Sequence, residues 1–294
     1  MGLLDRFKKF LASSSSSSRL DVSSRFQLQQ QAFSGTMSKF RVAREITTGR
    51  TLGLKFLDAE KSALFKARFK GLDKPSEGEI AMKIRHPSIV ETYEYGLTTS
   101  GQEYILMEYI EGPGLSSLLK TRDERMIANR LPFLKKMADA IQAVHDAGFI
   151  HRDICPRNFI CNVEVTDIKL IDFGLTVPDK PDYRSPGNRT GTPQYMAPEI
   201  VRRRPTDLRV DIFAFGVTAY RMLTFAHPWE STDTSGIGAL AHDSRPATSI
   251  FKYRPNLNEK LGRSVERCLA IKPDDRFAAI KQFSSLIIDL KSEE

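Results

Sequence analysis

Hydrophobic positions along the chain change their spacing near residue 112. Before this point short apolar runs alternate with turns, and four of them predict β-strands, at residues 40–44, 52–57, 89–95 and 103–110. The first two flank a turn at residues 48–50 and are expected to form a hairpin. A stretch with helical spacing lies between the second and third runs, so the pattern predicts a small sheet with one main helix.

Beyond residue 112 the apolar residues recur at helical spacing. The clearest helices are expected over residues 133–147 and 210–224, and the second is apolar enough to be a buried central helix. Residues 201–294 contain no clear pair of strands. The chain is therefore predicted to be α+β, with a strand-rich lobe and hinge at 26–112 and a larger helical lobe at 113–294.

The first 25 residues form a pattern of their own. Residues 1–12 combine apolar and basic side chains at helical spacing, namely Leu3, Leu4, Phe7, Phe10 and Leu11 with Arg6, Lys8 and Lys9 between them. Two interpretations stay open: this amphipathic segment contacts an anionic membrane surface, or it packs on the domain or frays. Residues 13–18 are all serine, and 13–25 are predicted to be a flexible linker.

Composition limits the protein class. The chain has 294 residues, of which 40% are hydrophobic and 27% charged, which suits one large domain or two lobes. It has no apolar run of about 18 residues and no secretory signal pattern, so a cytoplasmic location is expected. If residues 1–12 contact an anionic membrane surface, the protein would also lie peripherally at the inner membrane surface. The three cysteines, Cys155, Cys161 and Cys268, are too few and too irregularly spaced for a disulfide framework or a zinc site, and we expect free thiols.

The formal net charge is +8, which raises the question of an anionic partner. Basic residues are scattered along the chain, and no nucleic-acid motif interleaves them with aromatic residues. The pattern therefore favours a solvated surface around a phosphate-binding enzyme over a nucleic-acid-binding protein.

Candidate chemistry appears in the middle of the chain. Asp153 and Asn158 stand five positions apart in the run 151–158, and Asp172 follows fourteen residues after the amide. An acid at this place can accept the proton of an attacking hydroxyl, while an amide and a carboxylate supply oxygen ligands to Mg2+. Lys55 lies in a predicted strand of apolar residues and needs an anionic partner, because an unpaired buried ammonium is costly.

Five segments in this order resemble the catalytic domain of eukaryotic-type Ser/Thr protein kinases, over roughly residues 26–290. They are Leu52-Gly53-Leu54-Lys55, the loop 151–158, Asp172-Phe173-Gly174, the segment 191–199 that begins Gly191-Thr192-Pro193, and the segment 211–216. The resemblance implies a two-lobe kinase fold that binds ATP and Mg2+ and acts on Ser/Thr hydroxyls of protein substrates.

The resemblance also implies roles for individual residues. Asp153, Lys55, Arg157 and Thr192 would be catalytic, and Asn158 and Asp172 would hold the metal. Nucleotide contacts would come from Gly35, Phe40, Gly53, Lys55, Glu77, Met107, Glu108, Ile110 and Ile160. The helix glutamate that pairs with Lys55 would be Glu77, with Glu79 as the alternative. Asp211 would brace the catalytic loop, and Glu199 would pair with Arg276.

Three departures from the family pattern stand out. Of the three glycine positions that cover the phosphates, only Gly35 is glycine, because Phe33 and Ser38 occupy the other two. Cys155 replaces a lysine that neutralises the transferring phosphate, and Arg157 is expected to supply this charge, as in many tyrosine kinases, unless it points into solvent. Gly53 replaces the usual alanine above the adenine.

Two functions follow from these residues. The intact set of Lys55, Asp153, Asn158 and Asp172 favours an active kinase, and Thr192 favours Ser/Thr acceptors. The altered glycine loop and Cys155 motivate the alternative, a pseudokinase that acts as a nucleotide-binding scaffold or a regulatory binding module. Arg152 is expected to receive a phosphate on the loop before residue 199, for which Thr190 and Ser185 are the candidate sites.

Overall fold

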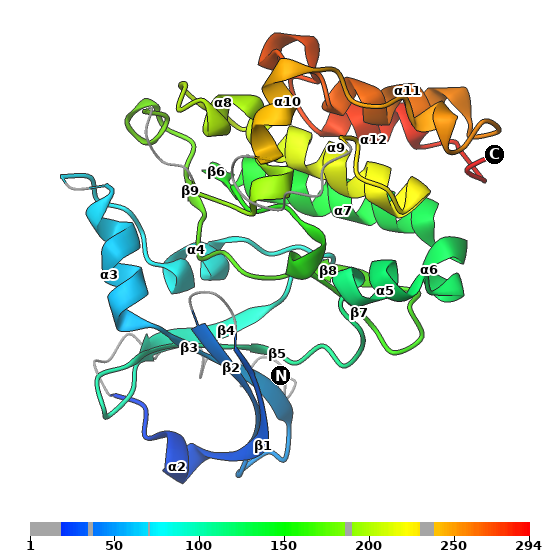
Figure 1. Ribbon diagram of the computed structural model, residues 1–294. Coiled ribbons are helices and arrows are strands. Elements are labelled where there is room, and N and C mark those ends of the chain that lie inside the picture. The colour runs from blue at the N-terminus through cyan, green and yellow to red at the C-terminus, as the bar shows by residue number, and fades with distance from the viewer. Residues whose placement is uncertain (1–18, 35–37, 70, 186–189, 230–237) are drawn as a thin grey trace, which may run out of the picture. The chain divides into compact units, whose positions relative to one another are not determined.

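The chain forms two compact units (Figure 1). The computed structural model describes residues 19–34, 38–69, 71–185, 190–229 and 238–294. The first unit consists of Met1–Lys70 and Glu91–Tyr109, and the second of Gly71–Val90 and Ile110–Glu294. The first is built on a β-sheet and the second mainly on helices, so the predicted α+β class is confirmed.

The sheet of the first unit has five antiparallel strands in the order β1-β2-β3-β5-β4. Their bounds are β1 (Phe26–Ser34), β2 (Ser38–Glu45), β3 (Thr51–Leu57), β4 (Thr92–Leu97) and β5 (Glu103–Glu108), with helices α2 (Val22–Arg25) and α3 (Ala59–Ala67) beside them. The four predicted strands correspond to β2 to β5, and the first two form the expected hairpin. Strand β1 was not predicted, because Gln29, Gln30 and Gln31 interrupt its hydrophobic alternation.

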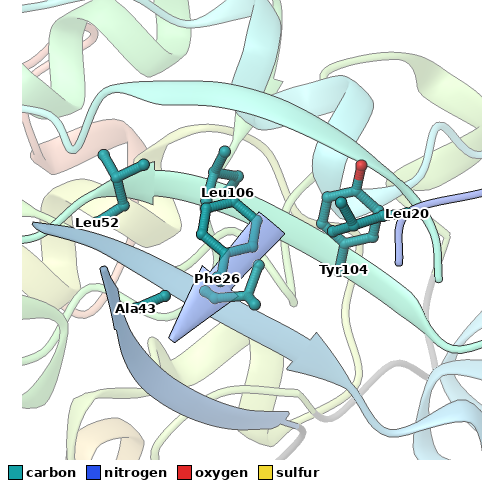
Figure 2. Close-up of a cluster of buried hydrophobic side chains, with 7 residues drawn as sticks. Leu20, Phe26, Ala43, Leu52, Tyr104 and Leu106 are labelled. Atoms are coloured by element: carbon teal, nitrogen blue, oxygen red, sulfur yellow. The ribbon is translucent and has the colours of Figure 1, made fainter. Parts of the chain in front are cut away.

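Strand alternation gives this sheet two different faces. Successive side chains of a strand point to opposite sides, so Gly53 and Lys55 lie on one face of β3 and Leu52 and Leu54 on the other. The second face is apolar and would be a large exposed patch without a cover. Figure 2 shows how it is covered: Leu20 and Phe26 pack against it. The cluster consists of these two residues with Ala43, Leu52, Leu54, Tyr104 and Leu106.

Residues 20–26, which we call the N-terminal strap, are fastened to the sheet by polar contacts as well. The Leu20 amide donates to the Leu97 carbonyl at 2.9 Å, and the Leu20 carbonyl accepts from the Thr99 amide at 2.9 Å. Arg25 forms ion pairs with Glu45 of β2 at 3.0 Å and with Glu94 of β4 at 2.8 Å. The predicted linker at 13–25 was therefore wrong for residues 20–25, whose few apolar side chains form no periodic pattern but complete the sheet's core.

The second unit is built around two buried helices, α7 (Arg130–Asp146) and α9 (Arg209–Thr224). They confirm the helices predicted over 133–147 and 210–224. The other helices are α4 (Glu77–Lys83), α5 (Leu115–Thr121), α6 (Glu124–Ala128), α8 (Pro198–Val201), α10 (Ala241–Ser244), α11 (Glu259–Cys268) and α12 (Lys281–Ile287). Helix α11 packs on α9 and α12 on α7, as Figure 1 also shows. Two short strand pairs complete the unit, β6 (Phe149–Ile150) with β9 (Val177–Pro178) and β7 (Phe159–Cys161) with β8 (Ile168–Leu170).

Residues 71–90 belong to the second unit, although the sequence placed them in the small lobe. The reason is backbone pairing: the Val90 amide donates to the Leu170 carbonyl at 2.9 Å, and the Leu170 amide donates to the Ser88 carbonyl at 2.8 Å. Helix α4, with Glu77 at its start, is therefore part of the helical unit. The predicted boundary after residue 112 lies close to the observed one between Tyr109 and Ile110.

The cysteine prediction is confirmed, because Cys155, Cys161 and Cys268 are all buried free thiols. None of the helices in the described ranges has the length and apolar character needed to cross a membrane.

We expect Leu20→Ala to lower the free energy of unfolding by about 2 kcal/mol, because it removes a buried side chain from the strap and leaves a cavity. Leu28→Ala is the matched control: Leu28 is 40% exposed, and its loss is expected to change stability by less than about 0.5 kcal/mol. Urea denaturation of both variants measures the difference. If Leu20→Ala lowered the free energy of unfolding by no more than the small change expected for Leu28→Ala, the strap would not contribute to the core.

Candidate active site

The loop that carries the candidate acid is held by Asp211, in the first turn of α9. The Asp211 carboxylate accepts the backbone amides of His151 and Arg152, both at 2.8 Å, and lies 2.9 Å from Nε2 of His145. Burial alone would raise the pKa of Asp211, but hydrogen bonding and attraction from His145 and His151 outweigh it and lower this pKa. Because the carboxylate stays ionised, it can hold Arg152 in the left-handed conformation, at φ 67°. The expected brace is confirmed.

Asp153 is surrounded by donors that fix its carboxylate. Asn158 Nδ2 donates to the Asp153 carbonyl at 2.7 Å and to its Oδ2 at 3.0 Å. Thr192 donates to Oδ1 from its amide at 2.9 Å and from its hydroxyl at 2.7 Å. Burial raises the pKa of Asp153, and these hydrogen bonds work in the opposite direction. The arrangement holds a carboxylate with raised basicity in one orientation, as proton abstraction from a hydroxyl requires.

A glycine allows the loop with Thr192 to approach this acid. Gly191 has φ 119°, which side chains rarely permit, and a Cβ there would lie 2.7 Å from the Arg152 carbonyl oxygen. Any larger residue would push the Thr192 segment away from Asp153. Glycine at position 191 is therefore a geometric requirement of this contact.

Arg157 reaches the same threonine. Its Nη2 donates to the Thr192 hydroxyl oxygen at 2.8 Å, while that hydroxyl donates to Asp153. Cys155 Sγ lies 3.5 Å from the hydroxyl, is buried, and has a pKa raised by burial, so it carries no charge at neutral pH. The contact places the Arg157 guanidinium next to the threonine that donates to Asp153, while the Arg157 side chain is otherwise exposed, so its role as the charge beside the acid stays a prediction.

Asn158 and Asp172 fit the expected Mg2+ ligands by their chemistry. Because the Asn158 amide nitrogen donates to Asp153, its oxygen is the atom that can bind a cation. Asp172 has φ 71°, and its Oδ1 accepts the Gly174 amide at 2.9 Å. Within the described residues no group of three or more His, Cys, Asp or Glu side chains could hold a metal by itself.

The two candidate glutamates of α4 have different surroundings. Glu79 forms a capping box with Ser76, in which its carboxylate accepts the Ser76 amide at 2.6 Å. Glu77 has its Oε2 3.3 Å from the position that a Cβ on Gly174 would take. Glu77 is thus the glutamate beside the segment that carries Asp172, and its pairing with Lys55 stays a prediction.

The remaining nucleotide candidates are divided between the two units. In the first unit Lys55 is buried, Phe40 lies opposite it in the β2–β3 pairing, and Met107 lies opposite Gly53 in the β3–β5 pairing. Glu108 ends β5 in that unit, whereas Ile110 and Ile160 belong to the second. Gly35 and the Phe33 side chain lie outside what the structure describes, so the expected effect of the altered glycine loop stays a prediction.

The activation-loop candidates differ in accessibility. Thr190 is buried, whereas Ser185 is exposed. Arg152 is buried and donates from Nη2 to the Thr206 hydroxyl at 3.4 Å, and its Nε and Nη1 have no partner in the described part of the chain. Of the two sequence candidates, only Ser185 is open to a modifying enzyme in this conformation.

Sequence reasoning missed two contacts that hold the segment after Thr192. The Arg221 guanidinium donates to the Tyr195 hydroxyl, and His242 Nδ1 lies 2.8 Å from the Met196 carbonyl oxygen. These partners are 26 and 46 positions apart in the sequence, and no local pattern connects them. Together they fasten this loop to helices α9 and α10.

The pair of Glu199 and Arg276 confirms the expected structural contact. Arg276 Nη1 and Nη2 donate to the two Glu199 oxygens at 2.7 and 2.9 Å, and its other N–H groups reach backbone carbonyls of Arg209, Ala270 and Ile271. The Arg276 side chain is fully buried. All five guanidinium donors are thereby satisfied, which makes the burial of this charge tolerable.

Comparison with known proteins gives a consistent result. The family model described as the protein kinase domain matches residues 26–285. A probable serine/threonine-protein kinase of Corynebacterium efficiens is 28% identical over 277 residues, which cover 90% of this chain and 41% of that protein. The serine/threonine-protein kinase Pkn1 of Myxococcus xanthus is 30% identical over 273 residues, covering 89% and 38%.

A third relative carries a different acceptor class in its name. The tyrosine-protein kinase MasK of Myxococcus xanthus is 32% identical over 235 residues, which cover 74% of this chain and 35% of that protein. This chain spans less than half the length of each of these three relatives.

We expect Arg276→Met to lower the free energy of unfolding by about 3–5 kcal/mol, because it leaves the Glu199 carboxylate buried without its cation. The exposed Arg263→Met is the control, with an expected change below about 0.5 kcal/mol. Urea denaturation measures both. Adding Glu199→Leu to Arg276→Met should recover part of the loss, and no recovery would contradict the charge-burial argument.

Proposed function

Because the chain belongs to the protein kinase family, we propose that it transfers the γ-phosphate of ATP to Ser or Thr hydroxyls of protein substrates. One observation carries the proposal: Asp153 is oriented by Asn158 and Thr192, and Arg157 donates to the same Thr192 hydroxyl. A scaffold that transfers no phosphate would not need a fixed carboxylate with a cation beside it.

Each residue of the site would have its own role in the reaction. Asp153 accepts the proton of the substrate hydroxyl, and Asn158 and Thr192 keep its carboxylate oriented throughout. Arg157 places positive charge where the negative charge of the transferring phosphoryl group needs stabilising, the role of the missing lysine at position 155. Mg2+, when bound with ATP, neutralises phosphate charge, and Asn158 and Asp172 would hold it. Lys55 would bind the α- and β-phosphates.

The proposed acceptor class rests on Thr192. Its hydroxyl donates to Asp153, the contact that the Ser/Thr-kinase resemblance implies for a site open to a small hydroxyl side chain. One relative is named a tyrosine-protein kinase, so tyrosine acceptors belong in the same assay.

We further propose that residues 1–12 contact anionic membrane lipid and so place the kinase peripherally at the cytoplasmic face. The support is the sequence pattern of apolar and basic residues, which lies outside the described residues. The N-terminal strap begins at Leu20 and is fastened to the sheet, so lipid contact by this segment would hold the first unit near the membrane.

We expect Arg157→Ala to lower the turnover number by about 100- to 1,000-fold, the size of losing one charge-stabilising donor. The dissociation constant of Mg-ATP should stay nearly unchanged, because Arg157 acts on the transferring group. Transfer from labelled ATP to peptides with Ser, Thr or Tyr measures turnover, and calorimetry measures binding. Arg263→Ala is the surface control, and adding Cys155→Lys to Arg157→Ala should restore part of the loss.

Asp153→Asn sets the background of this assay. If the natural sequence binds Mg-ATP yet transfers no more phosphate than Asp153→Asn, the chain is a pseudokinase and the proposal fails. Full activity of Arg157→Ala would leave the kinase assignment intact and remove the role of Arg157.

The full chain should sediment with vesicles containing anionic phospholipid, and a chain lacking residues 1–12 should not, because basic and apolar side chains act together at such surfaces. Vesicles of neutral phospholipid are the control, and high salt should weaken the binding. Equal sedimentation of the two chains would exclude membrane contact through this segment.

A further inference from the structure

A hollow on the helical unit lies outside the candidate active site. It has a volume of about 260 Å³ and is lined by Pro228, Trp229, Arg245, Pro246, Thr248 and Lys252. These residues come from two chain segments, one that follows α9 and one that follows α10. The six lining residues include none of the candidate catalytic, nucleotide or metal residues, so the hollow needs an explanation of its own.

The walls of this hollow are held together by hydrogen bonds between the two segments. Trp229 Nε1 donates to the Arg245 carbonyl at 3.0 Å, and the Thr248 amide donates to the Pro228 carbonyl at 2.8 Å. Trp229 is 5% exposed and stacks on Phe213 of α9, with ring centroids 5.7 Å apart. The shape is therefore present before any ligand binds, which lowers the ordering cost of binding.

The lining carries positive charge. Arg245 and Lys252 are both exposed, and Thr248 adds a hydroxyl that can donate a hydrogen bond. No acidic side chain is among the six described residues that line the hollow. Two cations and a hydroxyl at one concave site favour a ligand with negative charge and several acceptor oxygens.

Acidic side chains near the lining segments pair with other cations. Asp243 of α10 forms ion pairs with Arg202 at 2.5 Å and with Arg204 at 3.4 Å. Glu266 of α11 forms an ion pair with Arg263 at 3.1 Å. The two arginines bound to Asp243 also add positive charge beside α10, so the surroundings strengthen the preference for an anionic ligand.

The hollow is connected to the loop that reaches the candidate acid. His242 of α10 packs on Trp229, with ring centroids 4.3 Å apart, and its Nδ1 lies 2.8 Å from the Met196 carbonyl oxygen. Residues Gly238–Leu240, just before α10, pack on Pro193–Tyr195. A partner bound in the hollow would therefore be held on the part of the helical unit that carries this loop.

We propose that the hollow is a docking site for a negatively charged segment of a protein substrate, whose carboxylate or phosphoryl group is bound by Arg245 and Lys252. The proposal rests on the proposed function only for the word substrate, because binding itself requires no phosphate transfer. The volume lies just below the range of small-molecule sites, which suits one or two inserted side chains better than a whole metabolite. A concave site with fixed walls also suits a peptide better than the flat surface of a membrane.

Fluorescence anisotropy with labelled peptides tests the binding. The probes are Gly/Ser peptides that carry a central run of glutamate, a central phosphoserine or a central run of glutamine. We expect the glutamate or the phosphoserine peptide to bind, more weakly as salt rises, and the glutamine peptide to remain unbound. Arg245→Gln and Lys252→Gln should each raise the dissociation constant about fivefold, the upper range for one partly exposed ion pair.

The controls match these substitutions in charge. Arg125→Gln removes one positive charge from the same unit, but Arg125 pairs with Asp123 at 2.8 Å and lines no part of the hollow. Its peptide binding should equal that of the natural sequence. Arg245→Lys and Lys252→Arg keep the charge and should retain most of the binding. Position 245 holds Trp229 through its carbonyl, so these variants keep that bond, and thermal denaturation verifies that each is folded.

The docking role is tested by kinetics. The substrate is a peptide in which an acceptor serine and the bound anionic group are joined by a flexible Gly/Ser spacer. Lys252→Gln should raise KM about fivefold and leave kcat nearly unchanged, because docking precedes the chemical step. An unchanged KM would overturn the docking role.

The peptides also distinguish the source of the anion. Binding of the glutamate peptide alone identifies a carboxylate and binding of the phosphoserine peptide alone a phosphoryl group, and both results support the site. The proposal is wrong if neither peptide binds, or if Arg245→Gln and Lys252→Gln bind as tightly as the natural sequence. It is also wrong if these two variants lose binding to anionic vesicles while no peptide binds, which would assign the hollow to lipid.

Failure of the proposed function gives a different result. A chain that binds the anionic peptide with the expected pattern of variants, yet transfers no more phosphate than Asp153→Asn, would refute kinase activity and leave the anionic-peptide site standing.

Discussion

The loop that carries the proposed catalytic acid depends on the buried carboxylate of Asp211. It accepts two consecutive backbone amides, those of His151 and Arg152, and so forces the chain into a turn that residues other than glycine rarely adopt. Because this backbone conformation is unfavourable for a residue with a side chain, it persists only where surrounding contacts hold it in place. The helix α9 that carries Asp211 is buried along most of its length, so the loop is attached to an element that is held by packing on several sides.

Everything near Asp153 follows from that anchoring. Once the loop is fixed, Asn158 can fold back on the acid, and Gly191 can bring Thr192 against it from the other side. Arg157 then approaches Thr192 from two residues further along the loop than Cys155. The neutral Cys155 thiol lies buried beside the same Thr192 hydroxyl.

Much of the site was readable from the sequence, since kinase motifs are local. Asp153 and Asp172 stand in short runs that could be recognised in the sequence. The spacing of apolar residues also predicted the helices around residues 140 and 217, where the structure has them. Some information was present but unused: Ser76 followed three residues later by Glu79 is the pattern of a capping box, which distinguishes Glu79 from Glu77. Other features left no local signal. The strap residues Leu20 and Phe26 have too few apolar neighbours in the sequence to show a period.

The sequence alone determined the class of the protein and its candidate reacting residues, because the candidate acid, amide and metal ligand must stand at set distances along one loop and its neighbouring strands. Only the tertiary structure decided which residues the departures from the family pattern contact. Arg157 with Thr192 and Phe40 with Gly53 are 35 and 13 positions apart in the sequence. Whether such pairs touch depends on how strands and loops pack, and packing is a property of the folded chain.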